Sequence, residues 1–259
     1  MNTPATRSAT VHVVTEGRTA VVTLDRPPLN ILDIPMMREL GAALVHLADQ
    51  CDFIVFQGAG PKAFSAGAEV RDHTPDRVAK MLAAFHDVVR QLHRSDCVTI
   101  AAVHGHCLGG GMELATFCDF VLATESAQFG QPEIKLGCFP PVALLTLPRL
   151  AGPRAAYDLI LTGRSISARE AQALGLVTRL VPDDRLAAEV ESLLRELGSL
   201  SPLVLRMTRQ ALRDRIGFDF EASLRGIEQL YLNELMQTED AREGIRAFLE
   251  KRAPVWVGR

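Results

Sequence analysis

The sequence lacks the features that mark several common classes of protein. Its five cysteines form no CxxC pair and are odd in number, so reduced thiols fit better than a disulfide framework. Its formal net charge is −3, so nucleic-acid binding has no electrostatic support. No run approaches the roughly 20 apolar residues of a membrane span, and the first nine residues lack the apolar core of a signal peptide. We therefore expect a cytoplasmic protein with neither nucleic acid nor membrane as a partner.

What remains is the composition of an ordinary globular protein. The chain has 259 residues, of which 47% are apolar and 23% charged. That length can form one large domain or two small ones, and it is long enough to bury a sizeable core. We find no internal repeats and no low-complexity tracts, so a repeat architecture is not predicted.

The most informative stretch runs from residue 98 to residue 133. Residues 98–103 are apolar and rich in β-branched side chains, which predicts a buried strand. Three glycines follow at 109–111, and a helical pattern begins at Met112. Glycine lets a ligand atom approach the main-chain N–H groups closely, and these amides lie at the positive end of the helix dipole. The arrangement suits a developing oxyanion.

Two glutamates accompany these glycines. Glu113 lies in the first turn of the predicted helix, and Glu133 follows twenty residues later in a QPE loop. Two carboxylates beside an oxyanion site indicate proton transfer at a carbon next to a carbonyl. On spacing alone, an ordinary helix start with a glutamate that complements the dipole is the more common interpretation of such a pattern.

The rest of the chain mixes strands and helices. Residues 11–14 and 19–24 predict a hairpin, and strand 19–24, helix 34–47 and strand 53–56 predict a parallel crossover unit. Helices are predicted at 153–162, 167–174 and 184–197, with Ser167 and Asp184 as N-caps, and residues 202–251 are almost wholly helical by pattern. We regard His104 and His106 as a poor metal pair and predict no metal site.

The segment HGHCLGGGMELATFCDFVLATESAQFGQPEIKLG resembles the signature of the enoyl-CoA hydratase/isomerase (crotonase) family, and KAFSAGAEV at residues 62–70 resembles its other hallmark. The similarity continues through TGRSISAREAQALGLVTRLVP to AREGIRAFLEKRAPVW and so covers nearly the whole chain. The resemblance implies an α/β fold, with a crotonase-like ββα spiral core at residues 1–200 and a C-terminal helical oligomerisation subdomain at residues 201–259. It also implies assembly as a homotrimer or a dimer of trimers.

The resemblance assigns roles to individual residues. The N–H groups of Ala68 and Gly110 would form the oxyanion hole, and Glu113 and Glu133 would be the catalytic carboxylates. No separate cofactor is implied, because coenzyme A is part of the acyl-CoA substrate. The resemblance also implies that five residues contact the coenzyme A moiety: Pro28, Leu29, Ala66, Phe248 and Lys251. Of these, Phe248 and Lys251 would reach it from a neighbouring subunit.

The chain departs from straight-chain hydratases after Glu133. In the straight-chain hydratases that the chain resembles, a glycine lies eight residues after this glutamate, and its N–H helps to hold the attacking water. This chain has Pro141 there, and proline has no N–H to donate. We therefore expect the water to be held differently, and we expect Pro140, Pro141 and Val142 to reshape the acyl pocket.

These features predict a hydratase that adds water reversibly to a conjugated enoyl- or dienoyl-CoA thioester. PPLNILDIPMM and PEIKLGCFPPVALLTLP are similar to the cyclohexa-1,5-diene-1-carbonyl-CoA hydratases. Alternatives are a short-chain enoyl-CoA hydratase, an isomerase, a decarboxylase, or a non-catalytic member that binds acyl-CoA or RNA. The presence of both glutamates favours hydration, because many isomerases and decarboxylases of the family keep one of them or neither.

Overall fold

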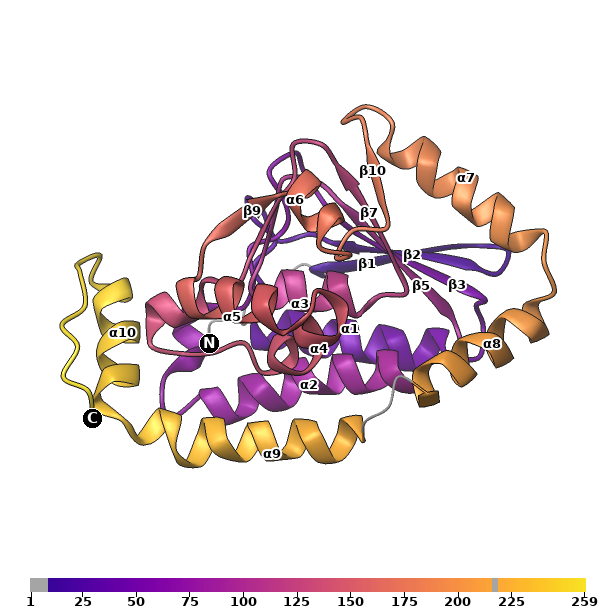
Figure 1. The fold of residues 1–259 in the computed structure, drawn as a ribbon. Coiled ribbons are helices and arrows are strands. Elements are labelled where there is room, and N and C mark those ends of the chain that lie inside the picture. Colours follow the sequence, from indigo (N-terminus) through magenta and orange to yellow (C-terminus); the bar gives the residue numbers. More distant parts are fainter. Residues whose placement is uncertain (1–8, 216–218) are drawn as a thin grey trace, which may run out of the picture.

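The fold is built around two sheets of unequal size. A computed structural model describes residues 9–215 and 219–259 (Figure 1). The larger sheet has the strand order β1-β2-β3-β5-β7-β10, in which only the β1–β2 pair is antiparallel. Its strands are β1 (Val11–Glu16), β2 (Thr19–Leu24), β3 (Phe53–Gly58), β5 (Val98–Val103), β7 (Phe120–Thr124) and β10 (Arg179–Val181). The smaller sheet consists of β4 (Ala63–Ser65), β6 (His106–Leu108), β8 (Gln128–Gly130) and β9 (Ser165–Ser167).

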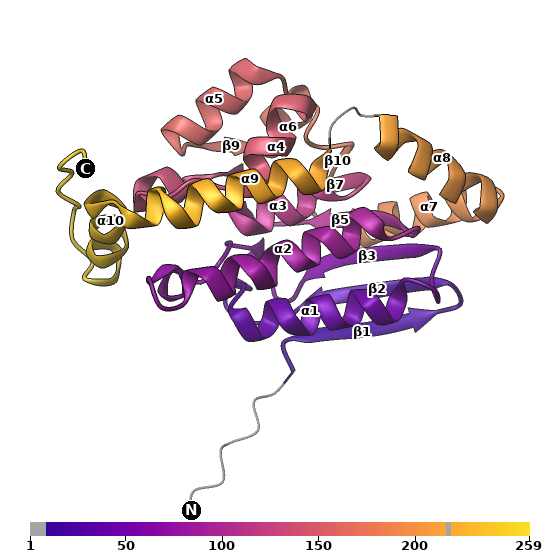
Figure 2. The ribbon, with the colours of Figure 1, turned by 90° about the horizontal axis from the view of Figure 1, so that it is seen from below.

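Helices cover both the inner face of the large sheet and the outside of the molecule. Figure 2 shows α1, α2 and α9 lying side by side below the sheet. The elements of the first part are α1 (Ile34–Leu47), η1 (Val70–His73), α2 (Val78–Arg94), α3 (Gly110–Phe117), η2 (Pro132–Leu136) and α4 (Pro141–Leu150). Those of the second part are α5 (Pro153–Thr162), α6 (Ala168–Ala173), α7 (Leu186–Gly198), α8 (Pro202–Arg215), α9 (Phe220–Asn233), η3 (Leu235–Gln237) and α10 (Glu239–Leu249).

The order of the elements repeats along the chain. β3 in the large sheet is followed by β4 in the small sheet and then by η1 and α2. β5, β6 and α3 repeat the pattern, and so do β7, β8, η2 and α4. Each repeat therefore places one strand in each sheet before a helix crosses back, which confirms the predicted ββα spiral and the α/β class.

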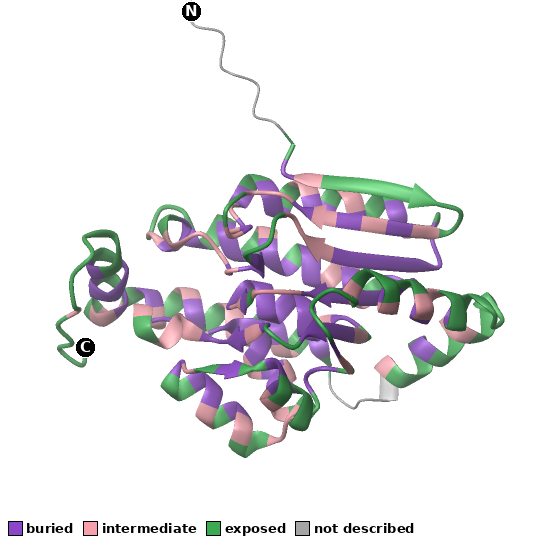
Figure 3. Cartoon of the chain, turned by 90° about the horizontal axis from the view of Figure 1, so that it is seen from above, coloured by how far each residue is buried: buried purple, intermediate pink, exposed green. Residues whose placement is uncertain are grey.

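Alternating side chains bury the large sheet on both faces. Ile54 and Phe56 of β3 lie in the main core under the helices, whereas Phe53 and Val55 lie in a second cluster with Leu193 of α7. This alternation is the period of two expected of a strand with two covered faces. Figure 3 shows the contrast between β1, exposed at the sheet edge, and the buried strands next to it. The packing therefore holds the central strands, whose ends carry the candidate site, in a rigid scaffold.

Several predicted elements have the observed bounds, and others do not. Strands 19–24 and 98–103 and helices 34–47 and 153–162 match, and Ser167 caps α6 by accepting from the Glu170 N–H. The prediction of Asp184 as an N-cap is wrong, because α7 begins at Leu186 after Arg185 and has no side-chain cap. A turn precedes it instead, closed by the Arg185 N–H to the Pro182 carbonyl. The helix α4, which begins at the double proline, was not predicted.

The C-terminal helices pack on the core of their own chain. α9 contacts α2 and α4, and α10 contacts η1 and η2, the segment that carries Glu133. A Cβ added at Gly244 of α10 would lie 2.2 Å from the Leu136 carbonyl oxygen, so the two segments are in direct backbone contact. The division into residues 1–200 and 201–259 stays a prediction. Within residues 9–215 and 219–259, no helix is both long enough and apolar enough to cross a membrane.

Candidate active site

A cavity of about 360 Å³ lies where the turns after β4 and β6 meet η2 and the C-terminal segment. It brings together residues that are far apart in the sequence, from the KAFSAGAEV segment, the glycine turn, the Glu133 loop and α10. Its lining is Ala66, Gly67, Ala68, Val70, His73, Gly109, Pro132, Glu133, Lys135, Leu136, Gly244, Phe248, Arg252 and Pro254.

Two backbone amides next to this cavity have no acceptor among the described residues: Ala68, which lines it, and Gly110, which follows the lining residue Gly109. Ala68 lies opposite Leu32 in a parallel β-bridge. The backbone hydrogen bonds of this bridge join Leu32 to the two residues that flank Ala68 and not to Ala68 itself. Its own N–H therefore points away from that partner. Gly110 is the first residue of α3, and the first amides of a helix have no intrahelical acceptor. No acceptor for either N–H is found in the described part of the chain.

Glycine backbone geometry brings these two amides together. Gly67 and Gly109 have φ values of 96° and 50°, a region that residues with a Cβ rarely adopt. A Cβ added at Gly67 would lie 3.3 Å from the Gly110 nitrogen, and one added at Gly110 would lie 3.6 Å from the Ala68 nitrogen. The two N–H groups thus lie on either side of a space that is kept open by missing side chains. They have the arrangement of an oxyanion hole.

Glu113 is held by the N-terminus of α4. Its side chain is buried, and its Oε1 accepts hydrogen bonds from the N–H groups of Val142 at 2.8 Å and Ala143 at 2.9 Å. No donor to Oε2 is found among the residues that the structure describes, so that oxygen is free to accept from a water. Burial raises the pKa of Glu113 to about 7, although the two N–H bonds oppose the shift.

Glu133 lies directly above the glycine turn. A Cβ added at Gly109 would be 2.6 Å from Glu133 Oε1, so only glycine at this position leaves room for the carboxyl group. The buried side chain of Gln131, oriented with its amide nitrogen toward Glu133, donates to the two carboxyl oxygens at 3.3 and 3.2 Å. Burial raises the pKa of Glu133 well above its usual range, and the charge of Glu113 raises it further.

The charge of Glu113 opposes the ionisation of Glu133, so we expect one of the two carboxyl groups to hold a proton near neutral pH. Glu113 has two short backbone donors that stabilise its ionised form, whereas Glu133 has only the longer contacts from one amide. We infer that Glu133 is the carboxyl group that holds this proton. An ionised base and a protonated acid next to an oxyanion hole can together move a proton to or from a carbon beside a carbonyl.

The double proline has a different effect from the one expected. Pro141 is the first residue of α4, where a missing N–H costs nothing. The next two amides are aimed at Glu113 rather than at a water molecule, and neither proline lines the cavity described above. Pro140, Pro141 and Val142 thus position a carboxylate through the backbone, and their direct contact with the acyl group or a water stays a prediction.

The residues predicted to contact coenzyme A are divided between two places. Ala66 and Phe248 line the cavity, Phe248 from α10 of the same chain. Leu29 supports the site indirectly, because its carbonyl accepts from the Ala66 N–H at 2.9 Å. Pro28 and Lys251 are exposed and do not line the cavity. Whether a neighbouring subunit contributes Phe248 and Lys251 stays untested.

Sequence reasoning missed three polar residues of the cavity. His73, Lys135 and Arg252 line it, and Lys135 brings to its wall a positive charge of the kind that an anionic ligand requires. Lys135 could have been found, because it follows Glu133 by two residues. Arg252 could not, because it reaches the cavity only through the packing of the C-terminal segment and pairs there with Glu243 and Glu250.

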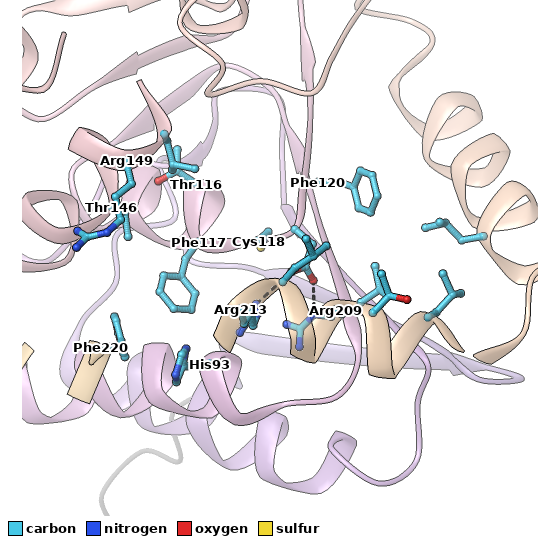
Figure 4. Close-up of a pocket in the computed structure, with 17 residues that line it drawn as sticks. His93, Thr116, Phe117, Cys118, Phe120, Thr146, Arg149, Arg209, Arg213 and Phe220 are labelled. Carbon is cyan, nitrogen blue, oxygen red and sulfur yellow. Dashed lines mark hydrogen bonds and ion pairs between the residues drawn. The ribbon is translucent and has the colours of Figure 1, made fainter. Parts of the chain in front are cut away.

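A second, larger cavity of about 460 Å³ lies beyond the C-terminal end of α3 (Figure 4). Apolar side chains dominate its wall, and its charged groups are paired: Asp119 Oδ2 accepts from Arg209 Nε at 2.6 Å and Asp119 Oδ1 accepts from Arg213 at 3.3 Å. It contains neither glutamate. In residues 9–215 and 219–259, no cluster of three or more His, Cys, Asp or Glu residues could hold a metal ion, and all five cysteines are buried and free.

Comparisons with known proteins agree with this geometry. Residues 15–259 match the family model described as enoyl-CoA hydratase/isomerase. A cyclohexa-1,5-dienecarbonyl-CoA hydratase of Thauera aromatica is 39% identical over 246 residues, covering 94% of this chain and 95% of that protein. A probable enoyl-CoA hydratase of Rhizobium meliloti is 40% identical over 247 residues, covering 94% and 96%.

Solved structures share the fold. A carnitinyl-CoA hydratase from Mycobacterium avium superimposes with a TM-score of 0.85 at 31% identity, covering 98% of this chain and all of that one. The match of the family model, the extent of the alignments and the shared fold lead to one conclusion. The chain belongs to the enoyl-CoA hydratase/isomerase family of enzymes.

Proposed function

We propose that the protein adds water reversibly to the double bond of a conjugated enoyl- or dienoyl-CoA thioester. The observation that carries the proposal is that Ala68 and Glu133 line the smaller cavity, that the backbone nitrogens of Ala68 and Gly110 lie close together, and that the charge of Glu113 acts on Glu133. The N–H groups of Ala68 and Gly110 would bind the thioester oxygen as it becomes enolate-like. Losing one such donor typically costs roughly 10²–10³ in rate.

The two glutamates divide the proton transfers. Glu113, held through Oε1, accepts a proton from the water at Oε2 while the water oxygen bonds to the unsaturated carbon. Glu133 delivers its proton to the carbon next to the carbonyl. Glu113 gains a proton from the water as Glu133 loses one to carbon, so the pair returns to its starting state when a proton passes from Glu113 to Glu133.

The lining of the cavity supports an acyl-CoA thioester as substrate. Lys135 supplies positive charge for phosphate groups, and Ala66 and Phe248 supply apolar contact. We expect the protein to assemble as a homotrimer or a dimer of trimers, as the family resemblance implies. We also expect it to be cytoplasmic, which suits its reduced cysteines.

We propose cyclohexa-1,5-diene-1-carbonyl-CoA as the substrate. Support comes from the Thauera aromatica relative, whose name states this activity, and from the double proline that replaces a water-binding amide. A short-chain enoyl-CoA is the second candidate, because the Rhizobium meliloti relative is equally similar.

The test is a side-by-side hydration assay of crotonyl-CoA and cyclohexa-1,5-diene-1-carbonyl-CoA, with products separated by mass. Turnover of the ring substrate alone supports the proposed substrate. Turnover of crotonyl-CoA alone makes the protein an ordinary short-chain hydratase. Hydration of neither, with the protein folded, overturns the proposed function.

A further inference from the structure

His73 is a buried histidine in the wall of the smaller cavity. It lies at the end of η1, is 6% exposed, and lines the cavity together with Ala68 and Glu133. A polar group that is buried without a hydrogen-bond partner costs free energy. The hydrogen bonds of the two ring nitrogens therefore indicate whether this imidazole only packs or also binds a ligand.

The two ring nitrogens of His73 differ in their partners. Nδ1 lies 3.1 Å from the Glu69 carbonyl oxygen, and a carbonyl can only accept, so the proton is on Nδ1. Nε2 has no hydrogen bond within residues 9–215 and 219–259. In the same residues, His86 Nε2 is the one side-chain nitrogen or oxygen that is both fully buried and unpaired. His73 Nε2 is therefore open to space, and the space is the cavity that the residue lines.

His73 Nε2 carries a lone pair and not a second proton. Burial lowers the pKa of His73 below its ordinary value, and it outweighs the Glu69 and Val70 carbonyls and the charge of Asp72, which act in the opposite sense. With the ring neutral and its proton on Nδ1, Nε2 can only accept a hydrogen bond. The cavity wall thus contains a neutral acceptor.

The other polar side chains of this wall have different capacities. Lys135 and Arg252 can only donate, and the carboxyl group of Glu133 accepts from Gln131. A ligand that brings an N–H or O–H donor into the cavity therefore finds its neutral side-chain acceptor in His73. An acyl-CoA thioester has such donors on both sides of its sulfur: the amide N–H groups of the pantetheine arm, and the hydroxyl that hydration adds to the acyl group.

Backbone hydrogen bonds fix His73 relative to the oxyanion hole. The neighbouring Asp72 is 1% exposed and accepts from the first N–H of α1 at 3.0 Å. Glu69, whose carbonyl holds Nδ1, donates its own N–H to the Leu32 carbonyl at 2.9 Å, in the bridge opposite Ala68. One anchored segment therefore supplies the cavity with both the Ala68 amide and the His73 imidazole.

We propose that His73 is a substrate-binding residue whose Nε2 accepts a hydrogen bond from a donor of the bound acyl-CoA thioester, either a pantetheine amide N–H or the acyl hydroxyl. The inference rests on the proposed function, which makes an acyl-CoA thioester the ligand. His73 keeps its single proton throughout, so the proton transfers of the two glutamates are unchanged. Binding should depend on an acceptor at this position and not only on the shape of the side chain.

The test compares His73→Gln with His73→Met. The two new side chains have nearly the same length and volume, but only glutamine ends in a group that can accept a hydrogen bond near the position of Nε2. Calorimetry gives the affinities of the wild type and both variants for two probes, butyryl-CoA and 3-hydroxybutyryl-CoA. His46→Met, at an exposed histidine outside the cavity, is the control, and thermal unfolding shows that each variant is folded.

We expect His73→Met to bind about fivefold more weakly, which corresponds to about 1 kcal/mol for one neutral hydrogen bond. His73→Gln and His46→Met should keep the affinity of the wild type. A loss confined to 3-hydroxybutyryl-CoA identifies the acyl hydroxyl as the donor, whereas an equal loss for both probes identifies a pantetheine amide.

Two outcomes overturn the inference. One is wild-type affinity of His73→Met for both probes, and the other is an equal loss in His73→Met and His73→Gln, which would make His73 a packing residue. A wild type that binds neither probe overturns the proposed function together with the inference. Binding without hydration overturns the proposed function alone, because the comparison needs no turnover.

A measurement on the wild type covers the case in which His73→Met does not fold. Nitrogen NMR of the protein with isotope-labelled histidine assigns the His73 ring as the signal that is missing from His73→Gln. Addition of 3-hydroxybutyryl-CoA should move the Nε2 resonance upfield, as for an unprotonated nitrogen that begins to accept a hydrogen bond. An unmoved Nε2 resonance at saturation overturns the inference.

Discussion

The two cavities differ in what their polar groups have left to bind. In the larger cavity, Asp119 is paired with two arginines, and the hydroxyl of Thr116 donates to the Met112 carbonyl. Beside the smaller one, the amides of Ala68 and Gly110 have no acceptor in the described residues, and burial raises the pKa of both Glu113 and Glu133. Volume therefore points to the wrong cavity, whereas unused hydrogen-bonding capacity points to the candidate active site.

The ionisation of the acidic groups shows the same contrast. Burial acts to raise the pKa of Asp119, but the charges of Arg213 and Arg209 outweigh it and hold the pKa below its ordinary value. Among the described residues no cation compensates the burial of Glu113, so its pKa is raised to about 7. A charge that is compensated by its neighbours stabilises a fold, whereas an uncompensated carboxyl group can exchange a proton at neutral pH.

Removing either carboxyl group should have the largest effect on activity. Glu113→Gln and Glu133→Gln should each lower kcat by about 10²–10⁴, because each removes one side of the proton transfer while keeping the shape of the side chain. Steady-state hydration kinetics give kcat, and calorimetry with coenzyme A should show nearly unchanged binding. Glu125→Gln, at an exposed carboxyl group, is the control and should keep full activity. Substantial turnover in both variants would contradict the mechanism.

A methyl group at Gly109 should displace Glu133 and lower kcat by about 10². The added Cβ would meet Glu133 Oε1 at 2.6 Å, too close for a real contact. Gly152→Ala is a matched control, because Gly152 also has a positive φ but open space around its Cα. Both substitutions should cost about 1–3 kcal/mol of stability through backbone strain, and only Gly109→Ala should lose activity. Equal activities in the two variants would show that the contact with Glu133 does not matter.

The pH profile should show an acid limb near pH 7. Glu113 must be ionised to act as base, so kcat/KM should fall about tenfold per pH unit below that value. Stability should change in the opposite sense. The folded-state pKa of Glu113 is raised, so the stability it contributes is present at low pH and is lost as the pH rises through about 7. Thermal unfolding at pH 5 and pH 8 should therefore show a smaller loss for Glu113→Gln than for the wild type, and an equal loss would contradict the shift.

The smallest effect on turnover is expected at the larger cavity. Asp119→Asn leaves the buried Arg209 without its counter-charge and should lower the free energy of unfolding by about 3 kcal/mol. Glu196→Gln breaks an exposed pair with Arg179 and should cost at most about 1 kcal/mol. Chemical denaturation measures both. A changed kcat in folded Asp119→Asn would show that the two cavities are coupled.

Local patterns predicted much of the fold, because the strands and helices concerned bury one regular face. Helix 34–47 and strand 98–103 were placed to the residue, since apolar spacing and a turn signal mark both ends. The helix at 141–150 was missed, because a double proline is typical of a loop and gives no sign that it also starts a helix. Asp184 was assigned as a cap from its residue type alone, although the turn before α7 ends elsewhere.

The sequence by itself determined which groups are candidates for the chemistry: the glycines that leave room for a ligand, the amides that follow them, and the two glutamates. These depend on residue type and short spacing, which are properties of the local chain. Only the tertiary structure decided that the Val142 and Ala143 amides hold Glu113, that α10 closes the cavity with Phe248 and Arg252, and that His73 and Glu133 line one cavity. Those contacts join segments far apart in the chain, and their geometry follows from packing on the two sheets, which no local pattern encodes.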